Sequence, residues 1–462
     1  MSFLDFIAFF LYSFLFSFFA SLYRKNIKDE TLKKYHRNAF WIKVFAAFCY
    51  SLFTLYFSPG DTTTLYFPEG YNFYKKILEN PANLDLVFGP GTDIDARMLA
   101  NPNQIGYFRD ASNFMVIRLT IILCFFGFGK YMVVNLMFSM IAFTGIWKLY
   151  TFFYEQFPQL HRQFAIAILY LPTFVFWSSG ILKDPLSIAA LGWFTYALYQ
   201  LAFHKKDIIK NTVIVLICVY IFSVIKIYIL VAYLPAFVIF LLLKNAMLIQ
   251  NRLVKAVLVS LFITGSIFGF VGLTNSMKGA VAEYAGEDIT EGISTYQKNY
   301  TAQSEKREGA YFSLGVEFDG SLTSLAKMAP AAIAATLYRP FLWESKNIST
   351  LLSSFESLTL MLFTLFVLRK VGFKKFFSSI IKKPIILYCF FFSIVFALFV
   401  GATTLNFGTL VRYKIPCMPF YVISLFLILF YNNKIKFATE PVIVTTLVSS
   451  KEENLTDQGR ID

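Results

Sequence analysis

The sequence has few charged residues and few cysteines. Charged residues make up 15% of the 462 residues, whereas 57% are hydrophobic and 56 are Phe. This leaves too little polar surface to cover a globular protein of this length in water, so a soluble fold is excluded. Only five cysteines occur, in or at the edge of apolar stretches and without paired or metal-like spacing: Cys49, Cys124, Cys218, Cys389 and Cys417. We interpret them as packing residues rather than as a disulfide framework or a metal centre.

The apolar stretches also lack the period-two alternation of outer-membrane barrel strands. Backbone groups in a bilayer must be satisfied within each segment, so long apolar stretches of this kind predict helices. There are twelve candidate spans: 3–22, 39–57, 113–128, 131–153, 164–179, 186–203, 209–225, 227–243, 255–274, 350–368, 385–401 and 415–431. The sequence therefore predicts an all-α, polytopic membrane helix bundle with about 11–12 transmembrane segments.

Basic residues give the chain a net charge of +14, and they lie in the short linkers between spans. Such linkers favour the cytoplasmic side, so anionic lipid headgroups rather than nucleic acid are the expected neighbours. The predicted cytoplasmic segments are 24–37, 204–210, 244–255, 369–383 and the tail after residue 431. The first span has no basic residue before it and is interpreted as a retained anchor whose N-terminus faces outward.

An outward N-terminus and a cytoplasmic tail require an odd number of crossings, so one of the twelve candidates must be re-entrant, interfacial or fused to its neighbour. The segment 113–128 is favoured because it is short and carries Arg118. The alternative fuses 209–243 into one crossing and moves Lys183 to the cytoplasmic face.

Two long polar loops are predicted on the outer side. Amphipathic helices are expected within them at residues 67–78 and 322–337. The predicted organisation is 1–57 N-terminal membrane helices, 58–110 first outer loop, 111–274 central transmembrane bundle, 275–349 second outer loop, 350–431 C-terminal transmembrane helices and 432–462 a disordered cytoplasmic tail.

Carboxylates in the first outer loop are candidates for catalysis and cation binding. Asp61 follows Pro59 and Gly60 at a turn near the outer membrane surface, where a base can meet a lipid-linked substrate. Its alternative role is to cap the stretch 62–66. Asp93 and Asp95 form an Asp-Ile-Asp triplet that can chelate a divalent cation together with a substrate phosphate; the alternative is a solvated loop.

Cations and carboxylates also lie beside the ends of several spans. Lys183 and Asp184 lie between Gly180 and Pro185, where ionisable groups are costly and usually functional, although the two can also neutralise each other. Arg339 and Glu344 lie in an aromatic segment that either binds substrate or anchors at the interface. Arg412 and Lys414 stand at the outer start of the last span, against the charge rule, which favours function. Together these cations can hold a phosphate or diphosphate while a carboxylate takes a proton from a sugar hydroxyl, as in glycosyl transfer.

Four motifs within residues 60–419 resemble those of bacterial polytopic cell-envelope polysaccharide proteins: Gly60-Asp61, Phe176-Trp-Ser-Ser-Gly-Ile-Leu-Lys-Asp184, Arg339-Pro-Phe-Leu-Trp-Glu344 and Gly408-Thr-Leu-Val-Arg412-Tyr. They are similar to the GT-C glycosyltransferase superfamily and to O-antigen polymerases. The resemblance implies that Asp61 is the catalytic base and that Lys183 and Arg412 hold the phosphate of a polyprenyl-phosphate sugar. The implied partners are a lipid-linked sugar donor, a glycan or lipid acceptor and membrane lipids, in the bacterial inner membrane.

Three alternatives stay open at this point. A polymerase would use outer arginines to bind a lipid-diphosphate oligosaccharide. A transporter or flippase would line an aqueous path with Arg118, Lys183 and Lys226, although no inverted repeat is found. A membrane scaffold would tolerate replacement of all the outer charges. No cofactor is required, since Arg and Lys can hold the phosphate, but the Asp-Ile-Asp triplet allows a divalent cation.

Overall fold

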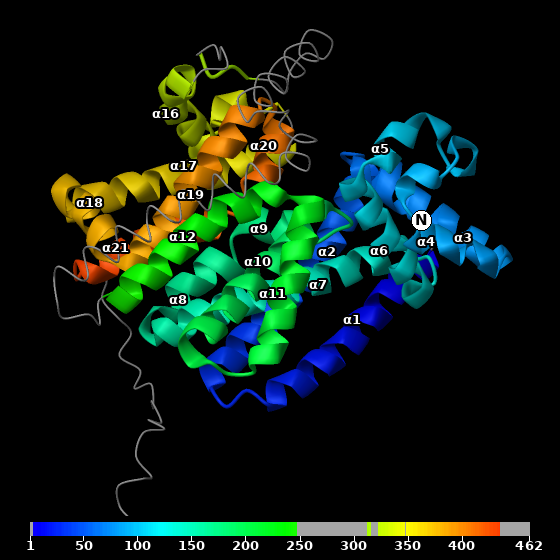
Figure 1. The fold of residues 1–462 in the computed structure, drawn as a ribbon, viewed down its shortest axis with the longest axis horizontal. Helices are drawn as coiled ribbons and strands as arrows, with labels where there is room; N and C mark the ends of the chain where they lie inside the picture. The colour runs from blue at the N-terminus through cyan, green and yellow to red at the C-terminus, as the bar shows by residue number, and fades with distance from the viewer. Residues whose placement is uncertain (1–2, 247–311, 316–321, 347, 435–462) are drawn as a thin grey trace, which may run out of the picture.

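A computed structural model describes residues 3–246, 312–315, 322–346 and 348–434. Every regular element in these ranges is helical (Figure 1), which confirms the predicted all-α fold. The predicted span 255–274, most of the second outer loop and the tail from residue 435 lie outside the described residues.

Eight helices among the described residues are long and apolar enough to cross a membrane, which makes the chain a multi-pass membrane protein. They are α1 (Phe3–Lys25), α2 (Glu30–Tyr56), α7 (Tyr131–Gln156), α10 (Lys183–Tyr199) with its π-helical continuation Gln200–His204, α11 (Ile208–Ile225), α12 (Ile227–Ala246), α17 (Ile348–Val371) and α19 (Pro384–Thr403). Two bent pairs raise the number to as many as ten: α5 (Ile105–Arg109) with α6 (Ala111–Gly127), bent by 106°, and α20 (Phe407–Tyr413) with α21 (Met418–Tyr431), bent by 61°.

The predicted span 164–179 is broken instead of forming one helix. It is built from α8 (His161–Phe164), a π-helix (Ala165–Leu169) and α9 (Pro172–Trp177). Proline has no N–H to donate and disfavours helical geometry in the residue before it. Leu171 is accordingly extended, with ψ 116°. The chain thus returns between α7 and α10 through a broken segment.

Helices α11 and α12 are two antiparallel crossings. Lys226, between them, pairs with Asp184 at the start of α10, with Nζ and Oδ1 2.5 Å apart. Lys244, near the other end of α12, donates to Gln156 at the end of α7 over 3.3 Å. The interpretation that fused 209–243 into one crossing is therefore wrong.

Helix α6 has both of its ends at one end of the bundle. Asp110, which precedes it, lies 3.7 Å from Lys183 at the start of α10. Lys130, just after it, lies 3.3 Å from Asp5 in the first turn of α1. Both ends of 113–128, the candidate predicted to be re-entrant, interfacial or fused to its neighbour, therefore lie on the same side of the bundle, and the way it meets the membrane stays a prediction.

Small residues allow the closest helix contacts, as is common where helices associate within a bilayer. Helices α7 and α10 meet at Gly145 and Gly192, where a Cβ on Gly192 would lie 1.8 Å from the Gly145 carbonyl oxygen. On α19, Gly401 lets α16 (Leu322–Tyr338) approach, since a Cβ there would lie 2.1 Å from the Ala332 oxygen. Helix α16 corresponds to the predicted helix 322–337.

The first outer loop is a chain of short helices at one side of the molecule (Figure 1). Its longest helix, α3 (Phe67–Glu79), confirms the predicted helix 67–78 and packs on α6. The others are the π-helix Thr62–Tyr66, α4 (Asp85–Phe88), α5 and the 3-10 helices Pro81–Leu84, Gly91–Asp93, Ala96–Met98 and Pro102–Gln104. A further amphipathic helix, α18 (Phe373–Lys382), joins α17 to α19 at the opposite end of the bundle from the loop.

Candidate functional site

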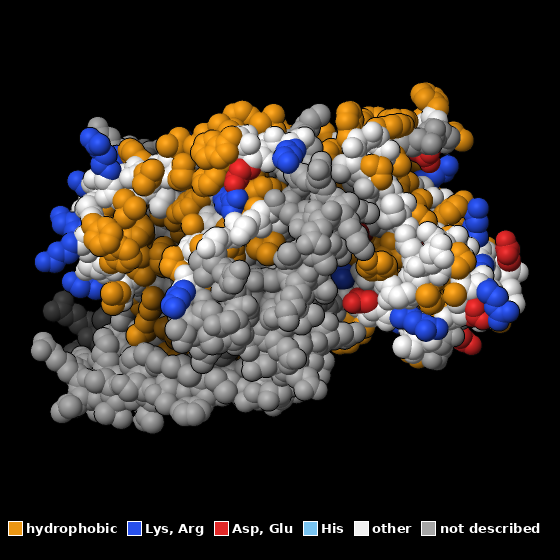
Figure 2. Space-filling model, turned by 90° about the horizontal axis from the view of Figure 1, so that it is seen from above, with side chains coloured by type: hydrophobic (Ala, Val, Ile, Leu, Met, Phe, Trp, Pro, Cys, Tyr) orange, Lys and Arg blue, Asp and Glu red, His pale blue; other side chains and the backbone are white. Residues whose placement is uncertain are grey.

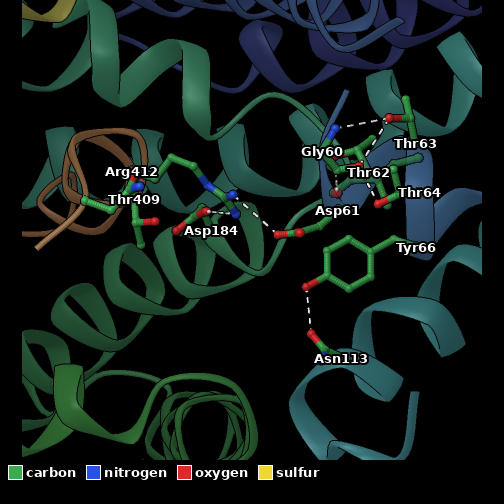
Figure 3. Close-up of polar contacts among 12 residues, drawn as sticks. Gly60, Asp61, Thr62, Thr63, Thr64, Tyr66, Asn113, Asp184, Thr409 and Arg412 are labelled. Carbon is green, nitrogen blue, oxygen red and sulfur yellow. Dashed lines mark hydrogen bonds and ion pairs between the residues drawn. The ribbon is translucent and has the colours of Figure 1, made fainter. Parts of the chain in front are cut away.

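A cluster of charged side chains lies where the first outer loop, the start of α10 and α20 meet (Figure 3). Arg412 is at its centre. One guanidinium nitrogen, Nη1, lies 3.4 Å from Oδ2 of Asp61, and the other, Nη2, lies 3.5 Å from Oδ2 of Asp184. The second oxygen of Asp184 accepts from Lys226, so four charges from four parts of the chain form one network. We refer to Asp61, Asp184, Lys226 and Arg412 as the outer cluster.

Asp184 owes its position to the way α10 begins. Leu182, the residue before the helix, is extended. Pro185 lies in the first turn, where no backbone N–H is needed for a hydrogen bond within the helix. A carboxylate in the first turn also interacts favourably with the helix dipole. Only 1% of the Asp184 side chain is exposed, which makes its two cationic partners necessary for burying the charge.

Asp61 precedes the π-helix Thr62–Tyr66 but makes no side-chain hydrogen bond to it, so its predicted alternative role as a helix cap is wrong. The turn is fixed by its neighbour Thr62, which is buried, bonds to Tyr50 and donates to the Ile181 carbonyl over 2.8 Å. The Asp61 carboxylate remains 53% exposed. It is therefore the most exposed member of the outer cluster.

Tyr66 lies beside Asp61 (Figure 3) and donates from its hydroxyl to Oδ1 of Asn113 over 2.8 Å. Burial raises the pKa of Tyr66, and the nearby negative charge of Asp61 adds to the effect. A neutral phenol next to an exposed carboxylate gives this side of the cluster a polar wall without further charge.

Lys183 points away from Asp184, toward α6. Its Nζ lies 3.7 Å from Asp110 and donates to the Ser112 hydroxyl. Since Asp184 pairs with Lys226 and Arg412 instead, the interpretation of Lys183 and Asp184 as a self-neutralising pair is wrong. Lys183 nevertheless lies beside the outer cluster, because it directly precedes Asp184 in the sequence.

Arg339, Glu344 and Lys414 form a second group, on the other side of α20. Arg339 forms a bidentate ion pair with Glu344, and its guanidinium carbon lies 4.3 Å from the ring centroid of Phe312. Lys414 is buried and donates to the Arg339 carbonyl and, over 2.9 Å, to the Ser357 hydroxyl. These contacts connect α16, α17 and α20, and the three residues predicted to bind substrate are here engaged with one another.

The predicted cation site in the first outer loop is only partly described. Asp95 is exposed and pairs with Arg97 over 2.6 Å, and the hydrogen bond from Arg97 lowers the pKa of Asp95 to about 2. The side chain of Asp93 lies outside the described part. Within that part, no group of three or more His, Cys, Asp or Glu residues is arranged to hold a metal ion.

Three ionisable residues within or beside apolar spans escaped the sequence-based assignment. Lys226 was considered only for a transport path. Lys43 is 2% exposed and donates to four oxygens at 2.6–3.2 Å, which are the carbonyls of Val175 and Ser178 and the hydroxyls of Ser178 and Ser179. Glu356 accepts from the Thr173 backbone N–H over 2.8 Å. The sequence could have pointed to these residues, because an ionisable residue within an apolar span is costly and usually has a functional or structural role.

The outer cluster combines a cation that can bind a phosphate with an exposed carboxylate that can accept a proton. No protein-family model, curated protein or solved structure matches the chain. Its chemistry must therefore be inferred from the cluster itself.

Proposed function

We propose that the chain is an integral membrane glycosyltransferase that takes a polyprenyl-(di)phosphate-linked sugar as donor. It acts at the outer face of the bacterial inner membrane, in the synthesis of a cell-surface polysaccharide or glycan. The observation that carries the proposal is the position of Arg412, which stands between the exposed Asp61 and the buried Asp184. A cation that can bind a phosphate and a carboxylate that can act as a base therefore lie close enough for one substrate to contact both, which supports the proposal.

Asp61 and Arg412 have complementary tasks in this reaction. Without substrate they pair with each other at 3.4 Å. When the donor binds, its phosphate forms an ion pair with the Arg412 guanidinium and replaces Asp61. The Asp61 carboxylate then becomes available to the acceptor hydroxyl. The acceptor oxygen then forms a bond to the anomeric carbon while the bond from that carbon to the phosphate oxygen breaks. Asp61 receives the hydroxyl proton, and the polyprenyl (di)phosphate leaves with the electron pair, stabilised by Arg412.

Asp184 and Lys226 hold Arg412 in place for this task. Lys226 holds Asp184, and Asp184 gives the guanidinium a fixed negative partner. The Arg412 side chain therefore keeps its orientation when its ion pair with Asp61 breaks. Lys183, held by Asp110 and Ser112 at the edge of the cluster, supplies further positive charge for a second phosphate. Both lysines thus add electrostatic stabilisation without touching the reacting carbon.

The proposal is tested in a deletion strain of the source bacterium that carries the wild type, Asp61→Asn or Arg412→Ala, with protein amounts checked by blot. Surface glycan and lipid-linked intermediates are the readout. We expect both variants to be made normally and to leave the surface glycan missing, with the lipid-linked donor accumulating. Accumulation of a single oligosaccharide repeat instead of a lipid-linked monosaccharide would identify the polymerase form of the reaction.

Asp95→Asn is the matched control, because it removes a carboxylate of the same outer loop that also pairs with an arginine, but on the exposed surface. We expect it to restore the glycan fully. If Asp61→Asn and Arg412→Ala restore the glycan as well, the transferase proposal is wrong and a transporter or scaffold role takes its place.

A further inference from the structure

A second polar feature lies at the other end of the bundle from the outer cluster. A cavity of about 470 Å³ is lined by the ends of α7 and α10, the π-helix Gln200–His204 and the start of α11. Gln200 follows Asp184 by 16 residues in sequence, so about 24 Å of helix separates the cavity from the outer cluster. The basic linkers predict that this end is cytoplasmic, and we refer to the feature as the inner cavity.

The inner cavity has an excess of positive charge. Lys148, Lys206 and Lys210 line it, together with the carboxylates Glu155 and Asp207. None of these three lysines takes part in an ion pair within the described ranges. Ammonium groups at a cavity without a paired carboxylate can accept an anion.

One wall of the cavity is aromatic, and its two rings are hydrogen-bonded to neighbouring side chains. The Nζ of Lys148 lies 4.9 Å from the Trp193 ring centroid and 4.5 Å from that of Tyr196. Trp193 donates to Thr144 from its indole nitrogen over 3.0 Å, and Tyr196 donates to Glu155 over 3.3 Å. The two rings therefore hold the lysine by cation–π contact, while Glu155 is engaged by a phenol. The ammonium stays available to an incoming anion.

The basic turn beside this wall has an unusual backbone. Lys205 and Asp207 both adopt left-handed geometry, with φ of 49° and 47°, which is uncommon for residues other than glycine. Such geometry persists where surrounding contacts determine it, and the buried Asn211 supplies one by donating to the Lys206 carbonyl over 2.8 Å. The turn sets Lys206 and Lys210 at the cavity while leaving both side chains exposed.

The cavity also borders a surface suited to lipid. Helix α11 is apolar, and its exposed residues include Ile209, Val213 and Leu216, which are 83%, 48% and 62% exposed. Acyl chains fit along such a helix, whose first turns line the cavity. A headgroup attached to those chains would reach the lysines.

From this combination we propose that the inner cavity binds a phosphate-bearing group at the membrane surface. Two sources share that chemistry, an anionic phospholipid headgroup and a free phosphate compound. Lys148, Lys206 and Lys210 hold the phosphate, and the Trp193 and Tyr196 rings form the wall against which it lies. This binding is independent of the proposed glycosyl transfer.

The test uses the purified full-length protein. Native mass spectrometry compares retention of phosphatidylglycerol with that of phosphatidylcholine, and Trp193 fluorescence, obtained by subtracting the signal of Trp193→Phe, reports titration with pyrophosphate. We expect selective retention of phosphatidylglycerol if the source is lipid, or a saturable fluorescence change if it is a free phosphate compound. Lys206→Gln/Lys210→Gln lowers whichever binding occurs by roughly thirtyfold, and Lys148→Gln lowers it as well.

The matched control is Lys374→Gln/Lys375→Gln, which removes two cations from α18 at the same end of the bundle but outside the cavity. It should leave binding unchanged. The proposal is overturned if the wild type prefers neither lipid and shows no fluorescence response, or if the α18 control weakens binding as much as the cavity variants do. Thermal unfolding of each variant shows whether it has kept its fold.

Discussion

Asp184 is the residue on which the outer cluster depends, because its two oxygens serve two cations. Lys226 takes Oδ1 at 2.5 Å and Arg412 approaches Oδ2 at 3.5 Å, while the side chain is 1% exposed. A buried carboxylate with two cationic partners is electrically balanced only when Asp61 supplies the remaining negative charge. Each charge in the cluster therefore influences the energy of the others.

Removing Asp184 should destabilise the protein more than removing both members of its closest pair. Asp184→Asn leaves Lys226 buried without a counter-charge, which typically costs about 3–5 kcal/mol. The double variant Asp184→Asn/Lys226→Met should recover part of that loss. Thermal unfolding in detergent, followed by tryptophan fluorescence, measures the difference.

The exposed pair Glu30 and Lys33 on α2 gives a control for this cycle. Neutralising both residues should change stability by less than about 1 kcal/mol. Losses that simply add in the double variant of Asp184 and Lys226 would show that the buried pair is not coupled.

Lys43 illustrates a different use of a buried charge, since its four partners are neutral oxygens. Lys43→Met should destabilise the protein by about 1–3 kcal/mol, because the Ser178 carbonyl loses its donor, whereas the Val175 carbonyl keeps the Ser178 and Ser179 hydroxyls. Lys34→Met removes an exposed lysine from the same helix and should have little effect. Unfolding temperatures that are equal for the two variants would contradict a structural role for Lys43.

Several members of the outer cluster could be predicted from the sequence, but their ion-pair partners could not. Asp61, Asp184 and Arg412 were singled out because charge beside an apolar span is costly. Their partners are set by tertiary packing, since Arg412 and Asp61 are 351 residues apart and Lys226 and Asp184 are 42 apart. No local pattern encodes such distances. The contacts of Lys414 could not be predicted for the same reason, because its burial against Ser357 depends on where α17 packs.

At the scale of elements, the length of the apolar stretches predicted where helices occur, but it did not predict which stretches form one continuous helix. Ten of the twelve candidate spans correspond to the eight helices and two bent pairs, whereas 164–179 is broken at Pro172 and 255–274 lies outside the described residues. A proline within an apolar run permits either a kink or a break. Packing decides between them, which composition alone does not reveal.

The contact between α7 and α10 should be intolerant of any side chain at its closest point. Gly192→Ala places a Cβ 1.8 Å from the Gly145 carbonyl oxygen, so the two backbones must separate. We expect a loss of about 1–3 kcal/mol or more, measured as a lower unfolding temperature. Gly106→Ala is the control, because a Cβ there meets nothing within 4 Å. An unchanged unfolding temperature for Gly192→Ala would show that the helices are not packed this closely.

On the scale of the whole molecule, charge bias and helix contacts together predict one topology. The first outer loop and the outer cluster share one end of the bundle, and α18 and the inner cavity share the other. Single cysteines at Asp95 and Lys374 should therefore react with a membrane-impermeant maleimide from opposite sides of the membrane. Both are exposed in the structure. Labelling of both positions from the same side would contradict this arrangement.

Helices α11 and α12 give the sharpest check of the crossing number. Lys206→Cys, before α11, should be labelled from the same side as Lys374→Cys, because α11 carries the chain to the outer cluster and α12 brings it back. Labelling of Lys206→Cys together with Asp95→Cys would require a different path through the membrane.

The span of sequence that separates Asp61 from Arg412 also has a consequence for biogenesis. Asp61 emerges from the ribosome early, whereas Arg412 belongs to the bent pair α20 and α21, far later in the chain. The outer cluster cannot assemble until those last helices have entered the bilayer. A nascent chain halted before residue 407 would carry Asp61 and Asp184 without the guanidinium that joins them, so the outer cluster is one of the last features of the protein to form.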